Sequence, residues 1–476
     1  MIKDSVEHRE RAGQRRLDAY LDELATALGH ADREDPFRSY CLGLLLDGER
    51  KSVEPMAARL DPAHVQAKHQ SLHHFVAQAA WSDTALLEAV HRHVVPAIER
   101  QGPITAWIVD DTGIPKKGRH SVGVARQYCG QLGKRDNCQV AVTLSLANEH
   151  ASLPVAYRLY LPEAWAGDAE RRIKAGVPPD TPFQTKPRIA LDQIRAACAA
   201  GLPRGIVLTD AAYGNDTDFR SELTALGLIY AVGIQSSTTV WAPGTRPLPP
   251  KPWSGKGRRP TRLRRDDDHQ PVPVQDLALS LPASQWRSVT WRAGTNTPLR
   301  SRFAGVRVAA AHRDDERAEL RPEEWLLIEW PDSEAEPTKY WLLPADTPLQ
   351  DLVAAAKGRW RIERDYEELK QEIGLNHYEG RGWRGFHHHA TLCIAAYGFL
   401  IAERCLFPLG NASTAGKAKH LRYPQPFGRE APVRPERHEP TSIHSVRRHL
   451  IRGLVQRLPR CPCCLRQQKP PQQSIL

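Results

Sequence analysis

Three carboxylates at separate points of the chain could together form a site for phosphoryl-transfer chemistry. Asp110 and Asp111 end the apolar segment ITAWIVDD, Asp210 ends GIVLTD, and Glu363 lies in the charged segment GRWRIERDYEELKQEIGL. Because the carboxyl ends of parallel strands meet at one edge of a sheet, an aspartate from each strand can share a site there. A helix packed against that edge can add the glutamate.

Oxygen donors of this kind suit a hard divalent cation. No Cys or His accompanies them, so Mg²⁺ or Mn²⁺ is expected rather than zinc. Two such ions, about 4 Å apart, can activate a water or a 3′-hydroxyl on one side of a phosphodiester and stabilise the leaving oxygen on the other. A single aspartate at a strand end is more often a turn former or a helix cap, so it is the set of three that favours a two-metal site.

The segment 358–375 predicts an amphipathic helix. Its apolar residues recur at i, i+4, i+7 and i+11, namely at Ile362, Tyr366, Leu369 and Ile373. At about 100° per residue, one face carries Arg359, Glu363, Glu367 and Lys370. Glu368 and Glu372 point away from that face and are interpreted as solvated charge. Alone, the charged face would be a ladder of i,i+4 ion pairs. The two upstream aspartates favour a metal-binding role for Glu363, whereas Glu367 matches no role.

The loop TGIPKKGRHS follows the first acid and is basic. It brings Lys116, Lys117 and Arg119 next to the expected metals, together with His120. Such a loop could hold phosphate oxygens of a nucleic acid. The alternative is an ordinary polar turn between two strands.

Positive charge is concentrated at the C-terminal end. The 476-residue chain has a formal net charge of +11, and residues 411–476 hold thirteen Lys or Arg against three Glu. A tail rich in Arg and Pro is expected to be poorly ordered alone and to bind polyanions, most often nucleic acid. The alternative is a solubilising end. The CPCC sequence at 461–464 could bind zinc only with a second ligand pair, for example from His438, His444 or His449.

The texture of the sequence predicts an α/β protein with four regions. The expected strands are 104–111, 125–132, 138–147, 155–161, 205–210 and 228–234, with helices at 187–201 and 389–407. The expected regions are a helical N-terminal domain at 1–102, a mixed α/β domain at 103–234 and 346–408, a β-rich insertion at 235–345 and a basic tail at 409–476. The short N-terminal helices make a DNA-binding helix-turn-helix possible, although any helical bundle has this pattern.

Composition points to the cytoplasm and away from a membrane partner. The N-terminus is polar, and no run of eighteen apolar residues occurs. Nine cysteines, mostly isolated in apolar segments, are typical of reduced buried thiols.

Several of these segments resemble one protein family. WIVDDTGIPKKGRHSVGVARQYCGQLGKRDNCQVAVTLSLAN, LTDAAYG and GRWRIERDYEELKQEIGLNHYEGRGWRGFHHHATL are similar to the DDE transposases of bacterial insertion sequences. Within that family they resemble the group with a Tyr-x2-Arg-x3-Glu-x6-Lys signature, on which Arg359, Glu363 and Lys370 fall. Ala356 stands at the tyrosine position, which leaves the role of that tyrosine in doubt.

The resemblance implies a ribonuclease-H-like mixed sheet with flanking helices, a β-rich insertion before the glutamate helix and an all-helical N-terminal domain. It implies Mg²⁺-dependent (or Mn²⁺-dependent) cleavage at the element's ends, with two ions per site, followed by attack of the freed 3′-hydroxyl on target DNA. The implied ligands are Asp110, Asp210 and Glu363, with Asp111 as the alternate first acid.

The resemblance also implies how DNA is held. Lys116, Lys117, Arg119, Arg359 and Lys370 would contact the backbone of double-stranded DNA, at the transposon ends and at the target. The protein is expected to act in the bacterial nucleoid as a homodimer on DNA. One of seven tryptophans in the insertion could stack on a flipped base, although core packing is the ordinary role of each.

Three other functions remain open on the sequence. A DNA-binding protein could keep the fold without cutting, and a nuclease of the same fold could act in repair or defence without strand transfer. Paired carboxylates also serve glycosidases. The basic tail and loops favour a polyanionic substrate over a neutral sugar.

Overall fold

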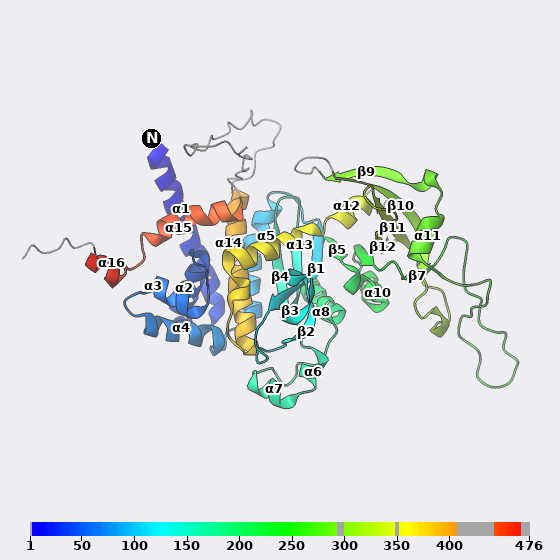
Figure 1. Ribbon diagram of the computed structural model, residues 1–476, viewed down its shortest axis with the longest axis horizontal. Helices are drawn as coiled ribbons and strands as arrows, with labels where there is room; N and C mark the ends of the chain where they lie inside the picture. The colour runs from blue at the N-terminus through cyan, green and yellow to red at the C-terminus, as the bar shows by residue number, and fades with distance from the viewer. Residues whose placement is uncertain (1, 293–298, 348–351, 407–441, 468–476) are drawn as a thin grey trace, which may run out of the picture. The chain divides into compact units, whose positions relative to one another are not determined.

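The computed structural model describes residues 2–292, 299–347, 352–406 and 442–467 (Figure 1). The chain divides into two compact units. The helical unit comprises Met1–Pro103, Ala175–Val177 and Glu367–Leu476, and the sheet unit comprises Ile104–Lys174 and Pro178–Tyr366. Each is described by itself.

The helical unit is built around one long buried helix. Its helices are α1 Ile2–Ala25, α2 Glu34–Leu45, α3 Val53–Leu60, α4 Val65–Ala77, α5 Asp83–Glu99, the π-helix η7 Leu369–Ile373, α14 Trp383–Leu406, α15 Ile443–Val455 and α16 Pro462–Gln467. Helices α1, α2, α4, α5 and α15 all contact α14. By length and hydropathy α14 could cross a membrane, yet 89% of its apolar window is buried inside the protein, as in the core helix of a soluble fold.

Part of the basic tail is an ordered helix, and the expectation of a poorly ordered tail is wrong for residues 442–467. Helix α15 buries Ile443, Leu450, Ile451 and Leu454. These positions follow i, i+7, i+8 and i+11, an apolar stripe of helical period. The Ser442 hydroxyl caps the helix by accepting a hydrogen bond from the Ser445 amide. The rest of the predicted tail, residues 409–441 and 468–476, lies outside the described residues.

Within the described residues of the sheet unit, twelve strands form one mixed sheet. The strands are β1 Ala106–Pro115, β2 Ala125–Cys129, β3 Lys134–Ala147, β4 Ser152–Leu159, β5 Ile206–Thr209, β6 Tyr230–Ile234, β7 Thr239–Trp241, β8 Val272–Pro273, β9 Arg287–Arg292, β10 Leu299–Ala310, β11 Glu323–Pro331 and β12 Lys339–Pro344. The order is β2-β3-β1-β5-β6-β12-β11-β10-β7-β8, with β4 beside β3 and β9 beside β10. Strands β1 and β3 are buried along most of their length, which explains their continuous apolar runs.

The core of this sheet has a ribonuclease-H-like order. Strands β4, β3 and β1 are antiparallel neighbours, and β1, β5 and β6 are parallel neighbours. Parallel neighbours need crossover connections, and helices α8 Lys186–Ala199 and α10 Thr217–Ala225 lie in the connections that lead to β5 and β6. Short helices α6 Glu163–Ala166, α7 Ala169–Lys174 and α9 Ala211–Gly214 complete this part. The expected fold class is therefore confirmed.

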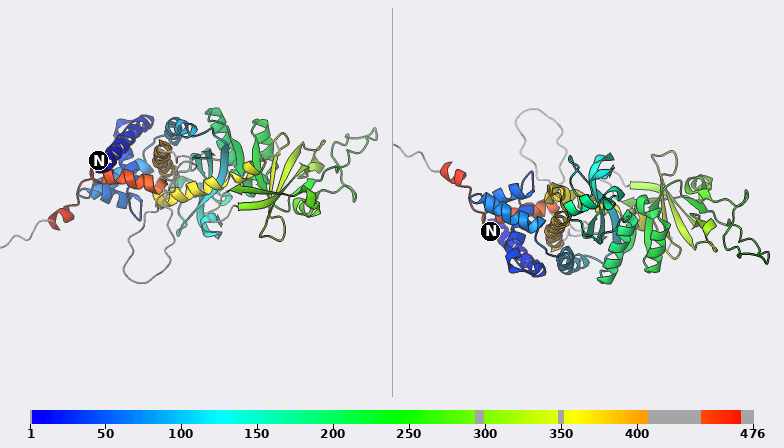
Figure 2. Two further views of the ribbon diagram at one scale, coloured as in Figure 1. Left: turned by 90° about the horizontal axis from the view of Figure 1, so that it is seen from above. Right: turned by 90° about the horizontal axis from the view of Figure 1, so that it is seen from below.

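The region expected as a β-rich insertion extends the same sheet. Strand β12 pairs antiparallel with β6, so that Tyr340 lies opposite Ile234 and Leu342 opposite Val232. Strands β11, β10, β7 and β8 follow outward, with helix α11 Val274–Ser280 after β8 (Figure 2). Helices α12 Leu352–Lys357 and α13 Trp360–Glu368 come next. The ribonuclease-H-like core and the insertion thus form one continuous sheet, joined by the pairing of β6 with β12.

Candidate active site

The first two acids lie inside a strand rather than at its end. Strand β1 pairs with β3 as far as Pro115, whereas its parallel pairing with β5 covers only Ala106–Ile108. Asp110 and Asp111 therefore follow the last residue that pairs with β5. The prediction that β1 ends at the acids is wrong because Thr143 and Val142 of β3 continue to pair with them.

The two neighbouring acids have different partners. Successive side chains of a strand point to opposite faces of the sheet, so Asp110 and Asp111 cannot face the same site. Nη1 of Arg359 donates to Oδ2 of Asp110 at 2.7 Å. Nζ of Lys186, the first residue of α8, donates to Oδ2 of Asp111 at 2.6 Å. The helix that carries Glu363 thus contacts Asp110.

Asp210 directly follows β5 and also caps a helix. Its Oδ1 accepts a hydrogen bond from the Ala212 amide at 2.9 Å, which satisfies one of the free N–H groups at the start of α9. Asp210 therefore acts as a helix cap, the ordinary role of an aspartate at a strand end. This role does not prevent the carboxylate from acting on Asp110, as the pKa shifts show.

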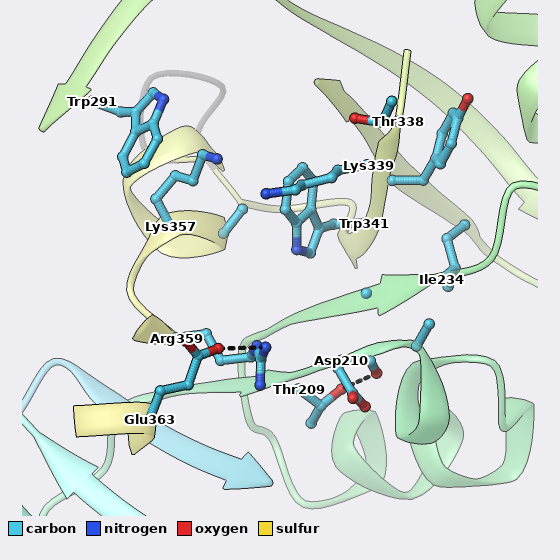
Figure 3. Close-up of a pocket in the computed structure, with 14 residues that line it drawn as sticks. Thr209, Asp210, Ile234, Trp291, Thr338, Lys339, Trp341, Lys357, Arg359 and Glu363 are labelled. Carbon is cyan, nitrogen blue, oxygen red and sulfur yellow. Dashed lines mark hydrogen bonds and ion pairs between the residues drawn. The ribbon is translucent and has the colours of Figure 1, made fainter. Parts of the chain in front are cut away.

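Glu363 lies on α13, one turn beyond Arg359. Nη2 of Arg359 donates to Oε1 of Glu363 at 2.9 Å (Figure 3). One guanidinium group therefore contacts both Asp110 and Glu363. The opposite side of α13 is held on the sheet by Asp365, which is buried and accepts a hydrogen bond from the Ser152 hydroxyl of β4 at 2.5 Å. The predicted face shared by Arg359 and Glu363 is therefore present.

The pKa shifts show that the three acids act on the same groups. The pKa of Asp110 is raised to about 7: burial raises it most, Arg359 lowers it, and the charges of Asp210 and Asp111 raise it. Burial by itself would lower the pKa of Arg359, but Asp110, Asp210 and Glu363 raise it. The carboxylates of Asp110, Asp210 and Glu363 therefore all lie close enough to the guanidinium of Arg359 to raise its pKa.

Tyr213 of α9 supports the same arrangement. Burial raises the pKa of this phenol, and the charges of Asp111, Asp110 and Asp210 raise it further. Its hydroxyl is buried and has no hydrogen-bond partner in the part of the chain that the structure describes.

The donor set fits a divalent cation, although its side chains are not arranged as a ready-made coordination sphere. All three groups are carboxylates, the ligands that Mg²⁺ prefers. The pKa of Asp110 is raised mainly by burial and, to a smaller extent, by the negative charges of Asp210 and Asp111. Arg359 supplies a positive charge between Asp110 and Glu363. Among the described residues, no group of three or more His, Cys, Asp or Glu is close enough to hold a metal ion.

A pocket of about 370 Å³ opens beside these acids. Asp210, Arg359 and Glu363 line one side, and four side chains of the insertion and α12 line the other, namely Trp291, Lys339, Trp341 and Lys357 (Figure 3). Ala356, at the tyrosine position of the signature, also lines the pocket, so its methyl group leaves room that a tyrosine ring would reduce. Sequence reasoning missed both lysines, since neither belongs to the signature.

Lys357 is held in place within that wall. Its Nζ donates to both carboxylate oxygens of Glu329 at 2.6 Å and lies 4.0 Å from the ring centre of Trp291. Burial lowers the pKa of Lys357, and Glu329 raises it. A buried acid in the middle of the insertion thus fixes a cation at the edge of the pocket.

The other tryptophans of the insertion lie in different environments. Trp241 is buried and donates to Asp314 at 2.6 Å, and Trp253 is 53% exposed. Trp286 and Trp330 pack edge to face, while Trp325 lies under the guanidinium of Arg307. Only Trp291 and Trp341 line the pocket among the residues that the structure describes.

The segment TGIPKKGRHS, which was predicted to hold phosphate, forms the end of β1 and the turn after it, and it does not line the pocket. Lys117 and Arg119 are exposed, and Lys116 is half-buried. The amide of Asn137 holds the turn by donating to the carbonyls of Lys116 at 2.6 Å and Gly118 at 2.9 Å. A role in DNA binding for this loop stays a prediction.

Lys370 does not follow the α-helical projection used for the sequence. The helix is α-helical only to Glu368, and Leu369–Ile373 form a π-helix that ends at Gly374 with φ of 86°. A π-helix closes its hydrogen bonds over one more residue than an α-helix, so the angle calculated for Lys370 no longer applies. Nothing in the sequence signalled this change of period.

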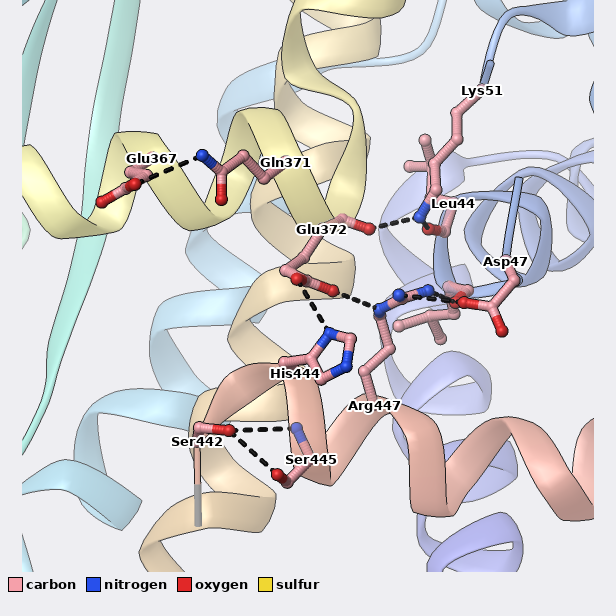
Figure 4. A network of polar contacts seen from close by, with 11 residues as sticks. Leu44, Asp47, Lys51, Glu367, Gln371, Glu372, Ser442, His444, Ser445 and Arg447 are labelled. Atoms are coloured by element: carbon pink, nitrogen blue, oxygen red, sulfur yellow. Dashed lines mark hydrogen bonds and ion pairs between the residues drawn. The ribbon is translucent and has the colours of Figure 1, made fainter. Parts of the chain in front are cut away.

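Glu368 and Glu372 are not solvated charges, and that prediction is wrong. The Tyr397 hydroxyl of α14 donates to Oε2 of Glu368 at 2.7 Å. Nε of Arg447 donates to Oε2 of Glu372 at 2.8 Å, and Nδ1 of His444 lies 3.0 Å from its Oε1 (Figure 4). These partners come from α14 and α15, far along the chain, so helical periodicity alone could not reveal them. Glu367 is exposed and accepts a hydrogen bond from Gln371.

Seven cysteines are free thiols, namely Cys41, Cys129, Cys138, Cys198, Cys393, Cys405 and Cys463. A zinc site at CPCC is not assembled from the described residues. The side chain of Cys464 and all of His438 lie outside them.

The sheet order and the acids at β1 and β5 place the chain among ribonuclease-H-like proteins. The model of the DDE superfamily endonuclease family matches residues 23–298, and the chain belongs to that family. Nucleases of this superfamily generally use divalent metal ions. The match includes Asp110, Asp111 and Asp210 and ends before Glu363.

One curated relative is similar over part of its length. It is described as a probable transposase for insertion sequence element IS701, from Microchaete diplosiphon, and is 32% identical over 204 residues. The matched segment is 43% of this chain and 49% of the relative, so the chain spans about half the length of the curated relative that it matches.

Proposed function

We propose that this protein is a transposase that cuts DNA at the ends of an insertion sequence and joins the freed 3′-hydroxyl to target DNA. The observation that carries the proposal is the contact of one guanidinium, that of Arg359, with carboxylates from β1 and α13. The similarity to a probable transposase supports the choice of substrate.

In this proposal Asp110, Asp210 and Glu363 hold two Mg²⁺ or Mn²⁺ ions. When bound, such ions lower the pKa of the attacking hydroxyl and offset the charge on the leaving oxygen. Asp110 is preferred over Asp111 because Asp111 is paired with Lys186 and points to the other face of β1.

In this proposal Arg359 binds two kinds of partner, one without DNA and the other with DNA. Without DNA it neutralises Asp110 and Glu363, and with DNA its planar guanidinium is suited to bind a phosphate through two parallel hydrogen bonds. A phosphate that recruits Arg359 would leave both carboxylates to a cation. Lys339, across the pocket, supplies further positive charge for the DNA backbone, whereas Lys357 is already paired with Glu329. Trp291 or Trp341 offers a ring on which an unpaired base can stack. The complex is proposed to contain two copies of the protein, one for each element end.

The test is cleavage of a DNA fragment that carries the element's own ends, with Mg²⁺ or with EDTA. Wild type is compared with Asp210→Ala, Glu363→Ala and the control Glu367→Ala, whose exposed side chain lies on the same helix. We expect cleavage and joined product only for wild type and the control, and only with the metal. Cleavage by either of the first two variants at the wild-type rate would show that the three acids are not the catalytic set. Comparison of Asp110→Asn with Asp111→Asn identifies the first ligand.

A further inference from the structure

The loop between β7 and β8 carries a dense run of positive charge at the free edge of the sheet. Residues 242–265, here called the basic loop, contain eight Lys or Arg and no Asp or Glu. Two of the eight are used at its base. Arg265 pairs with Asp314 and donates to the carbonyl of Ala311, and Nε of Arg264 donates to the carbonyl of Pro249.

The other six cations are exposed to solvent. They are Arg246, Lys251, Lys256, Arg258, Arg259 and Arg262. In the part of the chain that the structure describes, none of the six forms an ion pair. Within residues 242–265 the exposed charge is therefore all positive, and three exposed acids of the same connection, Asp266, Asp267 and Asp268, follow directly after it.

The basic loop is also held at its base and stiffened along its length. Leu248 and Arg264 exchange backbone hydrogen bonds of 2.9 Å, and the Leu263 amide donates to the carbonyl of Arg317 at 2.8 Å. Six of its twenty-four residues are proline, whose fixed φ reduces the conformations open to the free chain. A ligand that binds this loop would therefore lose less entropy than one that must order a flexible segment.

Sheet geometry gives the distance between strand β7, where the basic loop begins, and strand β5, which precedes Asp210. Along the strand order, β7 is five neighbours away from β5, which ends at Asp210. Adjacent strands are about 4.8 Å apart, so the two lie roughly 24 Å apart across the sheet. The views in Figures 1 and 2 show the loop that follows β7 extending beyond the outer strands. A duplex rises about 3.4 Å per base pair, so this distance corresponds to about seven base pairs.

We propose that the basic loop binds the phosphate backbone of duplex DNA at least about seven base pairs from the phosphate that is cut. Its position relative to the cut rests on the proposed function, whereas its affinity for duplex DNA does not. Contacts of this kind fix the register of the duplex without reading its sequence.

The experiment measures the salt dependence of DNA binding by the full-length protein in EDTA, so that no cleavage occurs. Fluorescence anisotropy on a duplex of about 30 base pairs, with the element end at its centre, gives the slope of log K against log salt concentration. This slope is negative, and each lost phosphate contact lowers its magnitude by about 0.9. For Arg258→Gln, Arg259→Gln and Arg262→Gln combined, we expect a decrease of up to about 2.7, equivalent to up to about 500-fold weaker binding at 0.1 M salt.

The matched control places Lys at the same three positions. Because phosphate contacts need the charge rather than the guanidinium shape, this variant is expected to keep the wild-type slope. A slope that is unchanged in the Gln variant overturns the proposal. A slope lowered equally by the Lys variant also overturns it, since the effect would then come from the shape of the loop.

Shortening the duplex tests the placement and separates the two sources of DNA. Trimming to about four base pairs on the element side, or on the flanking side, is expected to abolish the difference between wild type and the Gln variant for one side only. That side identifies element or flanking DNA as the partner. A difference that survives trimming of both sides overturns the seven-base-pair position. If wild type fails to cut with Mg²⁺, the proposed function fails, while the slopes on the long duplex still decide whether the basic loop binds DNA.

Discussion

Replacement of Lys51 by Met should change how the stability of the protein depends on pH. Lys51 is 2% exposed, and its Nζ donates to the carbonyl oxygens of Leu44 and Glu372 (Figure 4). The pKa of Lys51 is lowered to about 7, mainly by burial and also by the charge of Arg447. A neutral amine has two N–H groups, which matches the two carbonyl acceptors.

The direction of the effect follows from proton counts. In the unfolded chain a lysine holds its proton up to about pH 10.4, whereas folded Lys51 releases it near pH 7. Between these values the unfolded state binds more protons, so the free energy of unfolding rises with pH. The penalty for burying the charge is fully present below about pH 7 and is lost as pH rises through this interval. At 1.36 kcal/mol per pKa unit, the rise between pH 7 and pH 9 is about 2 kcal/mol.

The assay is urea unfolding at pH 7, 8 and 9, for wild type and for Lys51→Met. The variant leaves the two carbonyls without their donor, which costs about 1–3 kcal/mol at every pH. Only wild type has the titrating amine, so the stability difference between the two proteins should widen by about 2 kcal/mol from pH 7 to pH 9. Two curves that stay parallel over this range would refute the buried neutral lysine.

Two further substitutions test packing around the site and the tail. Arg447→Met removes the ion pair between two largely buried side chains, Arg447 and Glu372, so unfolding should require about 3–5 kcal/mol less. Arg448→Met, at the exposed neighbouring position, should change it by no more than about 0.5 kcal/mol in urea unfolding. Gly214→Ala would place a methyl carbon 2.0 Å from the carbonyl oxygen of Gly233, so α9 must shift; stability should fall by about 1–3 kcal/mol and DNA cleavage should fall with it. Gly118→Ala, with nothing within 4 Å, should match wild type in both measurements.

The strands and the acids could be predicted because they depend on local pattern. Buried strands of a mixed sheet read as apolar runs, and Asp210 ends such a run in both sequence and structure. The end of β1 could not be found in this way. Asp110 and Asp111 interrupt the apolar run, but the strand continues to Pro115 because β3, more than twenty residues later, supplies hydrogen-bond partners. Strand length there is a property of the sheet.

The helix around Glu363 shows the same limit from another side. Its period predicted correctly that Arg359 and Glu363 share a face, because residues four apart are neighbours in any α-helix. The roles of Glu368 and Glu372 depended instead on Tyr397, Arg447 and His444, which reach them through tertiary packing. No count of residues along one helix contains that information. The apolar stripe of α15 is present in the sequence, but the overall positive charge of the tail favours a prediction of disorder.

Because the sheet is continuous, the insertion is held in a fixed position relative to Asp210. Strand β12 pairs directly with β6, and Gly233 of β6 packs so closely on Asp210 that an added Cβ would lie 3.2 Å from its Cα. The wall that carries Trp341 and Lys339 is therefore fixed to the edge that carries Asp210 by backbone hydrogen bonds rather than by a flexible linker. The basic loop is attached to the same ladder through β7 and β10. In the proposed DNA complex, the spacing between the cut phosphate and a backbone contact at the basic loop would follow from the number of strands between them. Changing that spacing would require a strand to be added or removed, which no single substitution can do.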